Sequence, residues 1–348
     1  MTDDPLSPWA GAAVIAAAVR AGRVSAVDVS TAALDRVQAL NPGINAYTDV
    51  TAARALQEAR AIDAAQAAGL PLGPLAGVPF AAKNLFDIAG LPTRAGSRIN
   101  RDRPPARADA TLVTRMNRAG AVLLGALGMG EYAYDFTGEN AHDGACRNPH
   151  DPARMSGGSS SGSGAATAAG IAPVSLGSDT NGSLRVPASL CGVFSLKPTY
   201  GRLSRGGTFP FVDSLDHLGP MARSAQDLAL AYDALQGPDP ADHACTDRPA
   251  APTAAMPPDI RGLRIGVLDG WFQDNAGPEA LAAVATVAAA LAPETQILPA
   301  RLDAAEAVRA AAYLITNSES AAFHLERLRH RAAEFDLDTR DRFLAGAL

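Results

Sequence analysis

The sequence predicts an α/β fold with a mostly parallel or mixed sheet. Short apolar runs of strand length alternate with longer segments of helical pattern along most of the chain, and such alternation is typical of this fold class. The chain has 348 residues, of which 47% are hydrophobic. It is therefore long enough to bury a large core, either as one large α/β domain or as two smaller ones.

The N-terminal region, up to residue 70, carries mainly helical signals. Ser25 and Asp28 have the spacing of a capping box, and Thr51 is the expected cap of a further helix. The apolar run at 9–19 is too short to cross a bilayer and follows acidic rather than basic residues, which argues against a membrane span and a signal peptide. The expected elements are an alanine-rich surface helix over 9–19, a helix over 25–40, a strand over 44–50 and a helix over 51–69.

The middle of the chain alternates between strand and helix signals. Asp109 is the expected cap of one helix, and Ser224 with Asp227 forms the capping box of another. Residues 135–162 are rich in turn formers and show little periodicity. The expected elements are extended structure over 76–88, a helix after residue 109, strands over 121–127, 173–178 and 193–196, and helices over 165–169 and 224–235.

The C-terminal third begins with a change in composition. Residues 237–260 are rich in Pro, Ala and Asp and lack a hydrophobic period, which predicts a long loop or linker. The expected elements beyond it are strands over 264–268 and 296–298 and helices over 279–291, 304–315 and 340–348. The last helical pattern has no cap, so we expect the fold to be C-terminally incomplete. The expected parts are an N-terminal helical region over 1–70, a core over 71–236, the loop or linker, and the start of a C-terminal α/β part over 261–348.

The composition argues against several classes of function. The net charge is −6 and no stretch is strongly basic, so direct nucleic-acid binding is not expected. Cys146, Cys191 and Cys245 are scattered and form no CxxC motif, which disfavours a disulfide framework or a zinc site. The six histidines show no metal-binding spacing. We therefore expect buried structural thiols, a reduced cytoplasmic compartment, and no metal or cofactor.

The run at 156–164 consists of glycine and serine alone. Its composition is that of a flexible linker, but structured apolar sequence follows at once. A phosphate-binding loop is disfavoured, because a Walker motif needs a lysine here and Thr167 replaces the third glycine of the dinucleotide fingerprint. Residues 158–162 match the GxSxG nucleophile elbow, which must follow a strand. The preceding residues 147–155 contain two prolines and no strand pattern.

A second serine-containing turn comes 24 residues after Ser159. It follows an apolar strand and includes Gly182 and Ser183. Consecutive small residues after a strand can direct several backbone N–H groups to one point, which makes an oxyanion site. Asp179 and Arg185 flank this turn and are expected to pair and hold it.

Taken together, these segments resemble the amidase signature family. The resemblance covers most of residues 20–236, and several ordered motifs at family-like spacing are more specific than any one of them. The motifs are Gly77-Val78-Pro79-Phe80-Ala81-Ala82-Lys83, the Gly/Ser run, the Gly182-Ser183 turn, Cys191-Gly192 and Leu196-Lys197-Pro198-Thr199. The resemblance implies a mixed, largely parallel sheet covered by helices on both faces.

The resemblance also implies a role for each motif. Lys83 matches the general base, Ser159 the serine that relays the proton, and Ser183 the nucleophile. The peptide bond between Gly158 and Ser159 is expected to be cis. Tyr134 and Gly158 are the candidates for substrate contact. The backbone N–H groups that match the oxyanion site are those of Thr180, Asn181, Gly182 and Ser183.

The residue types fit this chemistry. A serine hydroxyl is a weak nucleophile and needs a neighbouring base, and a lysine serves as base only when burial lowers its pKa enough to leave it neutral. The chain has two lysines, Lys83 and Lys197, and arginine cannot act as a base. Lys83 has apolar neighbours, whereas Lys197 precedes Pro198 and is expected to be structural. Lys83 is therefore the expected base.

Four stretches resemble one branch of the family more closely, the 1-carboxybiuret hydrolase group of s-triazine (cyanuric acid) degradation. They are Thr137-Gly138-Glu139-Asn140, 147–151, 178–183 and 209–220. This resemblance implies a small-molecule amide substrate, a carboxylated urea, with ammonia as product. It also implies a small helical accessory subunit, with no direct contact to nucleic acid or membrane, and it leaves an oligomer open.

Two alternatives remain at the level of sequence. One is the glutamine-hydrolysing A subunit of an aspartyl/glutamyl-tRNA amidotransferase, which shares the same chemistry. The other is a catalytically inactive interaction subunit, which the presence of Lys83, Ser159 and Ser183 disfavours. Asn181 is a departure in either case, since it stands where many relatives carry glycine.

Overall fold

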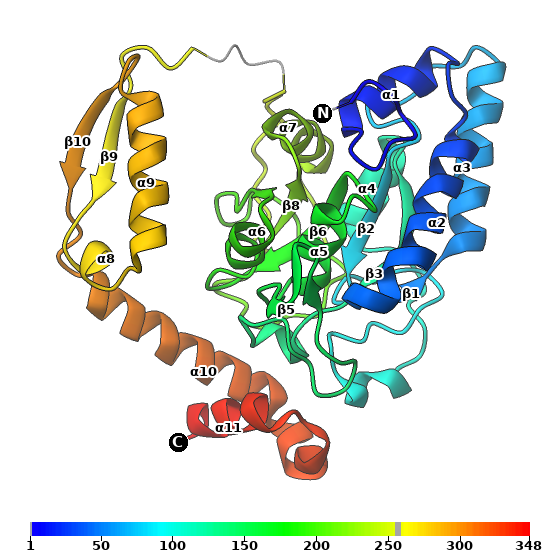
Figure 1. Cartoon of the computed structure of the whole chain (residues 1–348). Coiled ribbons are helices and arrows are strands. Elements are labelled where there is room, and N and C mark those ends of the chain that lie inside the picture. Colours follow the sequence, from blue (N-terminus) through cyan, green and yellow to red (C-terminus); the bar gives the residue numbers. More distant parts are fainter. Residues whose placement is uncertain (1, 255–258) are drawn as a thin grey trace. The chain divides into compact units, whose positions relative to one another are not determined.

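The computed structural model describes residues 2–254 and 259–348, and its contacts divide the chain into two compact units (Figure 1). The core unit comprises Met1–Ala254 with Ser318–Leu348, and the second unit comprises Ala255–Asn317. Helix α10 (Ala305–Arg331) takes part in both. Each unit is described by itself below.

A six-stranded sheet forms the centre of the core unit (Figure 1). Its strands, in spatial order, are β1 (Tyr47–Val50), β3 (Val122–Leu127), β2 (Pro79–Lys83), β6 (Val174–Asp179), β8 (His217–Ala222) and β7 (Phe194–Ser195). β3, β2 and β6 run parallel, β1 and β8 run against them, and β7 runs against β8. Four of these six strands therefore point the same way, which confirms the predicted mixed, largely parallel sheet.

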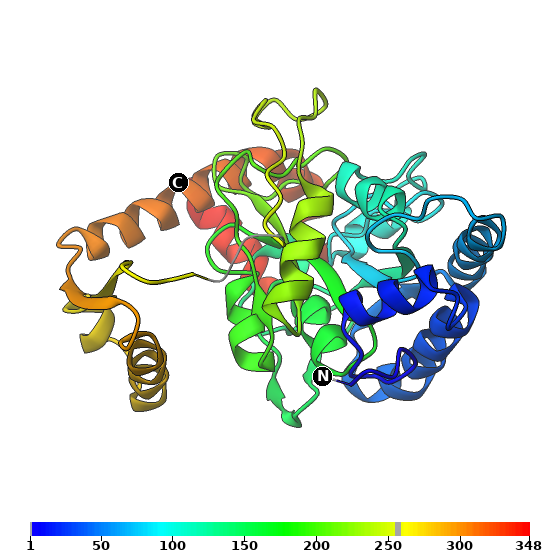
Figure 2. The same cartoon turned by 90° about the horizontal axis from the view of Figure 1, so that it is seen from above.

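The three central strands are buried at every residue. They read as continuous runs of apolar and small residues, as expected for parallel strands covered on both faces. Helices flank the sheet in both views (Figure 2), with α5 packed on β6 and β2 and α7 packed on β8. The helices are α1 (Ala12–Arg20), α2 (Ala26–Ile44), α3 (Ala52–Ala67), α4 (Thr111–Arg118), α5 (Ser161–Ala168), α6 (Arg185–Cys191) and α7 (Ala225–Leu235).

Two predicted helix caps are confirmed. Ser25 Oγ accepts a hydrogen bond from Asp28 N at 2.9 Å, and Ser224 Oγ accepts one from Asp227 N at 3.0 Å. α2 continues past residue 40 to Ile44 and ends at Asn45, which adopts the left-handed conformation. The following strand therefore begins at Tyr47 rather than at residue 44.

Two predicted side-chain caps are not formed, and one predicted helix begins later than expected. Thr51 occupies the N-cap position of α3, but its hydroxyl makes no capping hydrogen bond, because it donates to the Leu123 carbonyl of β3 instead. Asp109 does not cap α4, because its carboxylate forms a two-bond ion pair with Arg54 at 2.8 and 2.6 Å. The predicted surface helix at 9–19 is α1, which begins at Ala12 and has five buried residues. In the parts of the chain that are described, no helix combines the length and hydropathy that crossing a bilayer would require.

The sequence missed several short elements. The segment before the Gly/Ser run contains an antiparallel hairpin of β4 (Arg147–Asn148) and β5 (Asp151–Met155). All five β5 residues are exposed, so this strand has no hydrophobic alternation to detect. β8 contains Gly219 and Pro220, both unfavourable in strands. α6 and the 3-10 turns η1 (Arg98–Asp102), η2 (Glu131–Ala133) and η3 (Ala332–Glu334) were also not predicted.

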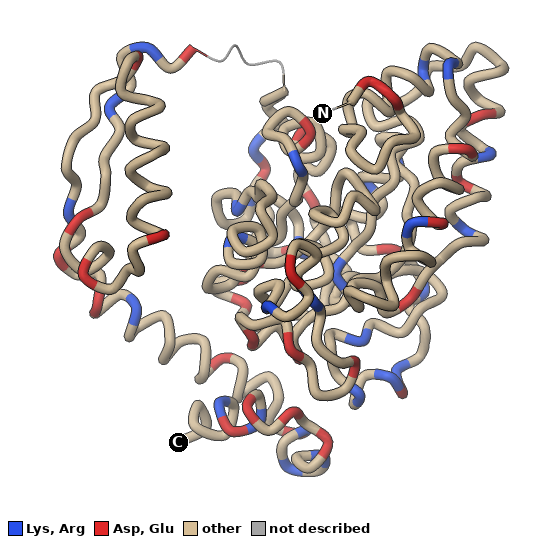
Figure 3. Tube along the Cα trace, viewed as in Figure 1, with Lys and Arg blue, Asp and Glu red and all other residues tan. Residues whose placement is uncertain are grey.

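The second unit is a small α/β layer. β9 (Arg264–Leu268) and β10 (Gln296–Ala300) pair in parallel, and α8 (Trp271–Asp274) and α9 (Pro278–Leu291) lie between them in sequence. The strands and α9 lie where the sequence predicted them. The predicted loop over 237–260 has no helix or strand in its described part, and residues 255–258 lie outside the described residues. Figure 3 shows that the positions of acidic and basic residues are interspersed along the Cα trace.

An aromatic cluster joins the C-terminal segment to the rest of the core unit. Phe343, on α11 (Leu337–Gly346), has no exposed surface, and its ring centroid lies 4.6 Å from that of His324 and 5.9 Å from that of Tyr134. Burial lowers the pKa of His324 to about 3, so this imidazole is neutral at neutral pH. The members of the cluster are Tyr132, Tyr134, Phe209, Phe211, Phe323, His324, Phe335 and Phe343.

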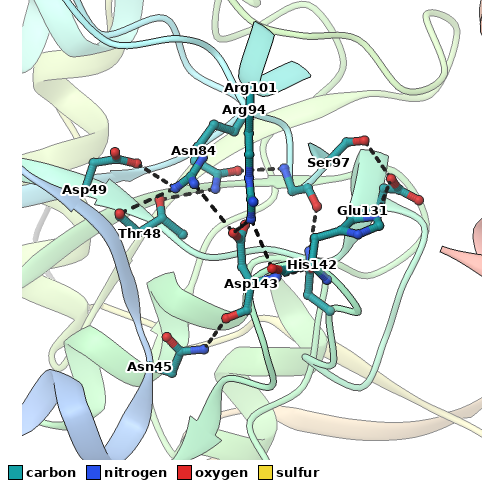
Figure 4. Close-up of polar contacts among 12 residues, drawn as sticks. Asn45, Thr48, Asp49, Asn84, Arg94, Ser97, Arg101, Glu131, His142 and Asp143 are labelled. Atoms are coloured by element: carbon teal, nitrogen blue, oxygen red, sulfur yellow. Dashed lines mark hydrogen bonds and ion pairs between the residues drawn. The ribbon is translucent and has the colours of Figure 1, made fainter. Parts of the chain in front are cut away.

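A polar network fixes the segment that leads to the Gly/Ser run (Figure 4). Asp143 pairs with Arg101 at 2.6 Å and with Arg94 at 3.6 Å. Buried Glu131 accepts a hydrogen bond from Ser97 Oγ at 2.6 Å, and its Oε1 lies 2.9 Å from His142 Nε2. These contacts hold residues 129–146 against the segment after β2.

We predict that Phe343→Ala lowers the free energy of unfolding by about 3–5 kcal/mol, because it leaves a cavity among rings that cannot easily close it. Its sequence neighbour Leu344 is 44% exposed, so Leu344→Ala should cost less than about 1 kcal/mol. Urea denaturation of the two variants makes the comparison. Equal losses would show that the aromatic cluster does not anchor α11.

Candidate active site

Lys83 is the centre of a buried polar site at the end of β2. Its Nζ lies 2.7 Å from Ser159 Oγ, 2.8 Å from Ser178 Oγ and 3.0 Å from Ser160 Oγ. The side chain has no exposed surface. β2 and β6 are parallel neighbours, so their carboxyl ends meet at one edge of the sheet, where ligand sites of α/β folds commonly lie. This arrangement brings Ser178, near the end of β6, to the amine of Lys83.

Burial dominates the electrostatics of Lys83. Removal from water lowers its pKa to about 7, against the opposing effect of the carboxylates of Asp216, Asp179 and Asp135. Desolvation disfavours the charged ammonium form, whereas nearby carboxylates favour it. A substantial fraction of the amine is therefore neutral at neutral pH and able to accept a proton.

The Gly/Ser run is a buried structural segment. Ser160 precedes α5, which begins at Ser161, and every residue from 156 to 164 is buried. The peptide bond between Gly158 and Ser159 is cis, as the family resemblance implied. Gly158 packs against the loop after η2, where its N–H donates to the Phe136 carbonyl at 3.0 Å. A side chain at Gly158 would collide with Asp135.

Asp179 holds the turn that follows β6. Its carboxylate accepts hydrogen bonds from Gly182 N at 2.7 Å and from Leu184 N at 3.2 Å. The predicted pairing with Arg185 is confirmed, with two contacts of 2.9 Å. Burial alone would raise the pKa of Asp179, but the hydrogen bonds and charge of Arg185 bring it below its ordinary value. The side chain is thus an ionised hub for the turn.

Ser183 lies in this turn and is 3% exposed. Its carbonyl oxygen accepts a hydrogen bond from Ser160 N at 3.4 Å, so the turn lies against the loop that carries Ser159. Gly182 has a φ of 139°, a conformation that favours glycine. Its N–H donates to the Asp179 carboxylate. Of the four backbone N–H groups expected to form the oxyanion site, this geometry therefore favours that of Gly182 least.

Tyr134 lies in the aromatic cluster, underneath α11. Its ring centroid is 5.1 Å from that of Phe211, and the guanidinium of Arg342 lies 5.0 Å from the Tyr134 ring. Arg342 also donates to the Tyr134 carbonyl at 2.9 Å. These contacts give Tyr134 a packing role, and its contact with a substrate stays a prediction.

A cavity of about 240 Å³ lies beside the lysine cluster. Ser178, which contacts Lys83, forms part of its wall. The wall also carries the carboxylate of Asp216 and the guanidinium of Arg205, which is paired with Asp242 at 2.9 Å. The lining residues of this cavity include Leu85, Ser178, Arg205, Phe209, Asp213 and Asp216.

Sequence reasoning missed three residues of this site. Ser160 adjoins Ser159, and Ser178 occupies the end of a predicted strand, so the expected convergence of strand ends could have identified both. Asp216 gave no such signal, because it lies 36 positions beyond Thr180, to which it is hydrogen bonded. Among the residues that the structure describes, no group of three His, Cys, Asp or Glu side chains could hold a metal ion.

Comparison with known proteins gives consistent relatives. The Amidase family profile matches residues 28–344. The chain is 58% identical over 334 residues to the AtzE subunit of 1-carboxybiuret hydrolase from Pseudomonas sp. (strain ADP), covering 95% of this chain and 72% of that protein. It is 46% identical over 262 residues to the A subunit of glutamyl-tRNA(Gln) amidotransferase from Moorella thermoacetica, covering 75% of this chain. The chain spans only 54% of that relative's length.

Solved structures show the same relationship. One, from a vestigial protein complex related to the origins of an s-triazine catabolic enzyme, matches with a TM-score of 0.94 and 56% identity, covering 97% of this chain and 74% of the other. The native peptide amidase of Stenotrophomonas maltophilia matches with a TM-score of 0.86 and 30% identity, covering 97% and 75%. The profile match over most of the chain and these identities show that the chain belongs to the amidase signature family of hydrolases, which act on the carbon–nitrogen bonds of linear amides.

Proposed function

We propose that the chain hydrolyses a linear amide through an acyl-enzyme, with Ser183 as nucleophile, Ser159 as proton relay and Lys83 as general base. The observation that carries this proposal is the geometry of Lys83. A fully buried amine with a pKa of about 7 lies 2.7 Å from the Ser159 hydroxyl. A base with a pKa near the working pH is the most effective.

The proton path follows from this contact. Neutral Lys83 takes the proton of Ser159 as Ser159 takes the proton of Ser183, and the Ser183 oxygen forms a bond to the amide carbonyl carbon. When the tetrahedral intermediate collapses, the carbon–nitrogen bond breaks and the proton returns through Ser159 to the leaving nitrogen. Water then repeats the sequence on the acyl ester and releases the acid. The hydrogen bond from Ser160 N to the Ser183 carbonyl supports the proximity of turn and loop that this path needs.

The negative oxygen of the intermediate requires preorganised donors. We assign this role to the backbone N–H groups of the turn at Thr180, Asn181, Gly182 and Ser183, of which the Gly182 N–H also donates to Asp179. Each well-placed donor lowers the barrier by about 3–4 kcal/mol. Asp179 contributes indirectly, because it fixes the backbone of the turn through Gly182, Leu184 and Arg185.

The proposed substrate is 1-carboxybiuret, with ammonia as product in s-triazine degradation. The identity of 58% to one subunit of a 1-carboxybiuret hydrolase over 95% of the chain supports this choice. Glutamine is the second candidate, supported by the lower identity of 46% to the A subunit of an amidotransferase. An inactive interaction subunit is the third candidate. This role would not require the lowered pKa of Lys83.

The proposal includes a cytoplasmic location and a small helical accessory subunit. Three cysteines that are not joined in disulfides support the location. A solved relative from a protein complex supports the accessory subunit. An oligomer of the chain itself stays a prediction.

We predict that Ser183→Ala lowers ammonia release at least about a thousandfold, because no other hydroxyl takes the place of the attacking oxygen. Ammonia should be measured with 1-carboxybiuret, biuret, glutamine and a simple aryl amide, in the presence of the accessory subunit. Ser195→Ala, at a half-buried serine on β7, is the matched control and should keep activity. Undiminished release by Ser183→Ala would refute the assigned nucleophile, and the preferred amide decides between the two substrate candidates.

We predict that kcat/KM rises with pH through an apparent pKa of about 7, because only neutral Lys83 can take a proton. Below that value activity should fall about tenfold per pH unit, since the protonated fraction grows by that factor. Lys83→Arg retains a positive charge that cannot be lost, so it should be inactive at every pH. Activity in Lys83→Arg, or a flat profile from pH 5 to 8, would exclude Lys83 as the base.

A further inference from the structure

Asp216 connects two elements of the site. Its Oδ1 accepts a hydrogen bond from Thr180 Oγ1 at 2.6 Å, at the start of the turn that carries Ser183. Its Oδ2 accepts hydrogen bonds from Phe211 N at 2.8 Å and from Val212 N at 3.0 Å. The carboxylate therefore ties the turn to the segment 205–215, which we call the strap.

The strap is held in place by contacts with other parts of the core unit. The hydrogen bond from Thr180 to Asp216 therefore connects the turn to a fixed segment. Arg205 pairs with Asp242 at 2.9 Å, and Phe209 N donates to the Leu85 carbonyl at 2.9 Å. Ser214 N donates to Glu319 of α10 at 3.1 Å. Movement of Thr180 relative to the strap would require breaking its hydrogen bond to Asp216.

Asp216 is also the foremost carboxylate acting on Lys83. Burial lowers the pKa of Lys83, and Asp216 opposes this effect ahead of Asp179 and Asp135. Asp179 is paired with Arg185. Asp216 has no ion pair within 4.0 Å among the described residues, so no directly paired cation neutralises its charge.

The groups facing Asp216 complete the electrostatic picture. Burial has the largest effect and raises the pKa of Asp216 above its ordinary value, while the hydrogen bond from Thr180 and, less strongly, the charge of Arg205 on the strap oppose it. Asp213 and Asp242 line the same cavity and share Arg205. Of these three cavity carboxylates, Asp216 is the one that bonds to the turn that carries Ser183.

We propose that Asp216 is a positioning residue of the amide-hydrolysing site, whose carboxylate fixes the Thr180 end of the turn that carries Ser183 against the strap. Its negative charge also favours the protonated form of Lys83. This inference rests on the proposed function for its effect on catalysis. Its effect on Lys83 can be measured without any activity.

The chain offers a direct measurement, because it has only two lysines. Protein labelled with ¹³C at lysine Cε gives one resonance for Lys83 and one for Lys197, and Lys83→Arg assigns them. In Asp216→Asn the midpoint of the Lys83 titration should fall by roughly one pH unit, because loss of the negative charge disfavours the ammonium form. The matched control is Asp213→Asn, at a 62% exposed carboxylate of the same cavity, and its Lys83 midpoint should stay within roughly 0.2 units of the unsubstituted protein.

Kinetics separate charge from anchoring. Asp216→Asn should move the acidic limb of kcat/KM to lower pH by the same unit, and Asp216→Glu should restore the limb by restoring the charge. Thr180→Val keeps the charge and removes the hydroxyl that reaches Asp216, so it should lower kcat roughly tenfold with KM and the acidic limb unchanged. If Asp216→Asn does not fold, Asp216→Glu and Thr180→Val carry the test.

The outcomes distinguish this inference from the proposed function. A Lys83 midpoint unchanged in Asp216→Asn, or shifted equally in Asp213→Asn, would overturn the electrostatic role. An unchanged kcat in Thr180→Val would overturn the anchoring role. Failure of the unsubstituted chain to hydrolyse any amide would refute the proposed function, while the titration of Lys83 would still decide whether Asp216 controls the amine.

Discussion

The site depends on one interaction, the burial of the Lys83 amine among serine hydroxyls. An amine removed from water is costly unless it is hydrogen bonded, and here Ser159, Ser160 and Ser178 supply three partners at 2.7–3.0 Å. Two of these serines come from the loop before α5, and one comes from β6. The parallel pairing of β2 with β6 and the packing of α5 on both strands are therefore what assemble the amine and its partners.

Elements with a local signature could be predicted from the sequence, and elements that depend on distant partners could not. Ser25 and Ser224 cap their helices because the donor lies three residues away. Thr51 and Asp109 occupy similar positions, but their side chains bond to β3 and to Arg54. The sequence did not predict β8, because Gly219 and Pro220 are unfavourable in strands. The place of β8 inside the sheet comes from its pairing with β6 along the whole of β6.

The same distinction applies to the site. Lys83, Ser159 and Ser183 lie in motifs of characteristic sequence, and the structure places Lys83 in contact with Ser159 and places the turn of Ser183 against the same loop. Asp216 reaches the site through its contact with Thr180, 36 positions away, so its sequence neighbours say little about it. The engagement of the Gly182 N–H by Asp179 depends on the path of the turn, which a list of small residues does not specify.

The hydrogen bonds that Asp179 accepts from the turn have a consequence for how the sequence of this protein can change in evolution. The carboxylate contacts main-chain N–H groups at 182 and 184, together with the Arg185 side chain. The frame of the turn is therefore held largely through main-chain groups, which every type of residue carries. Side chains of the turn that Asp179 does not contact can therefore change in evolution while the hydrogen bonds between Asp179 and the main chain are kept.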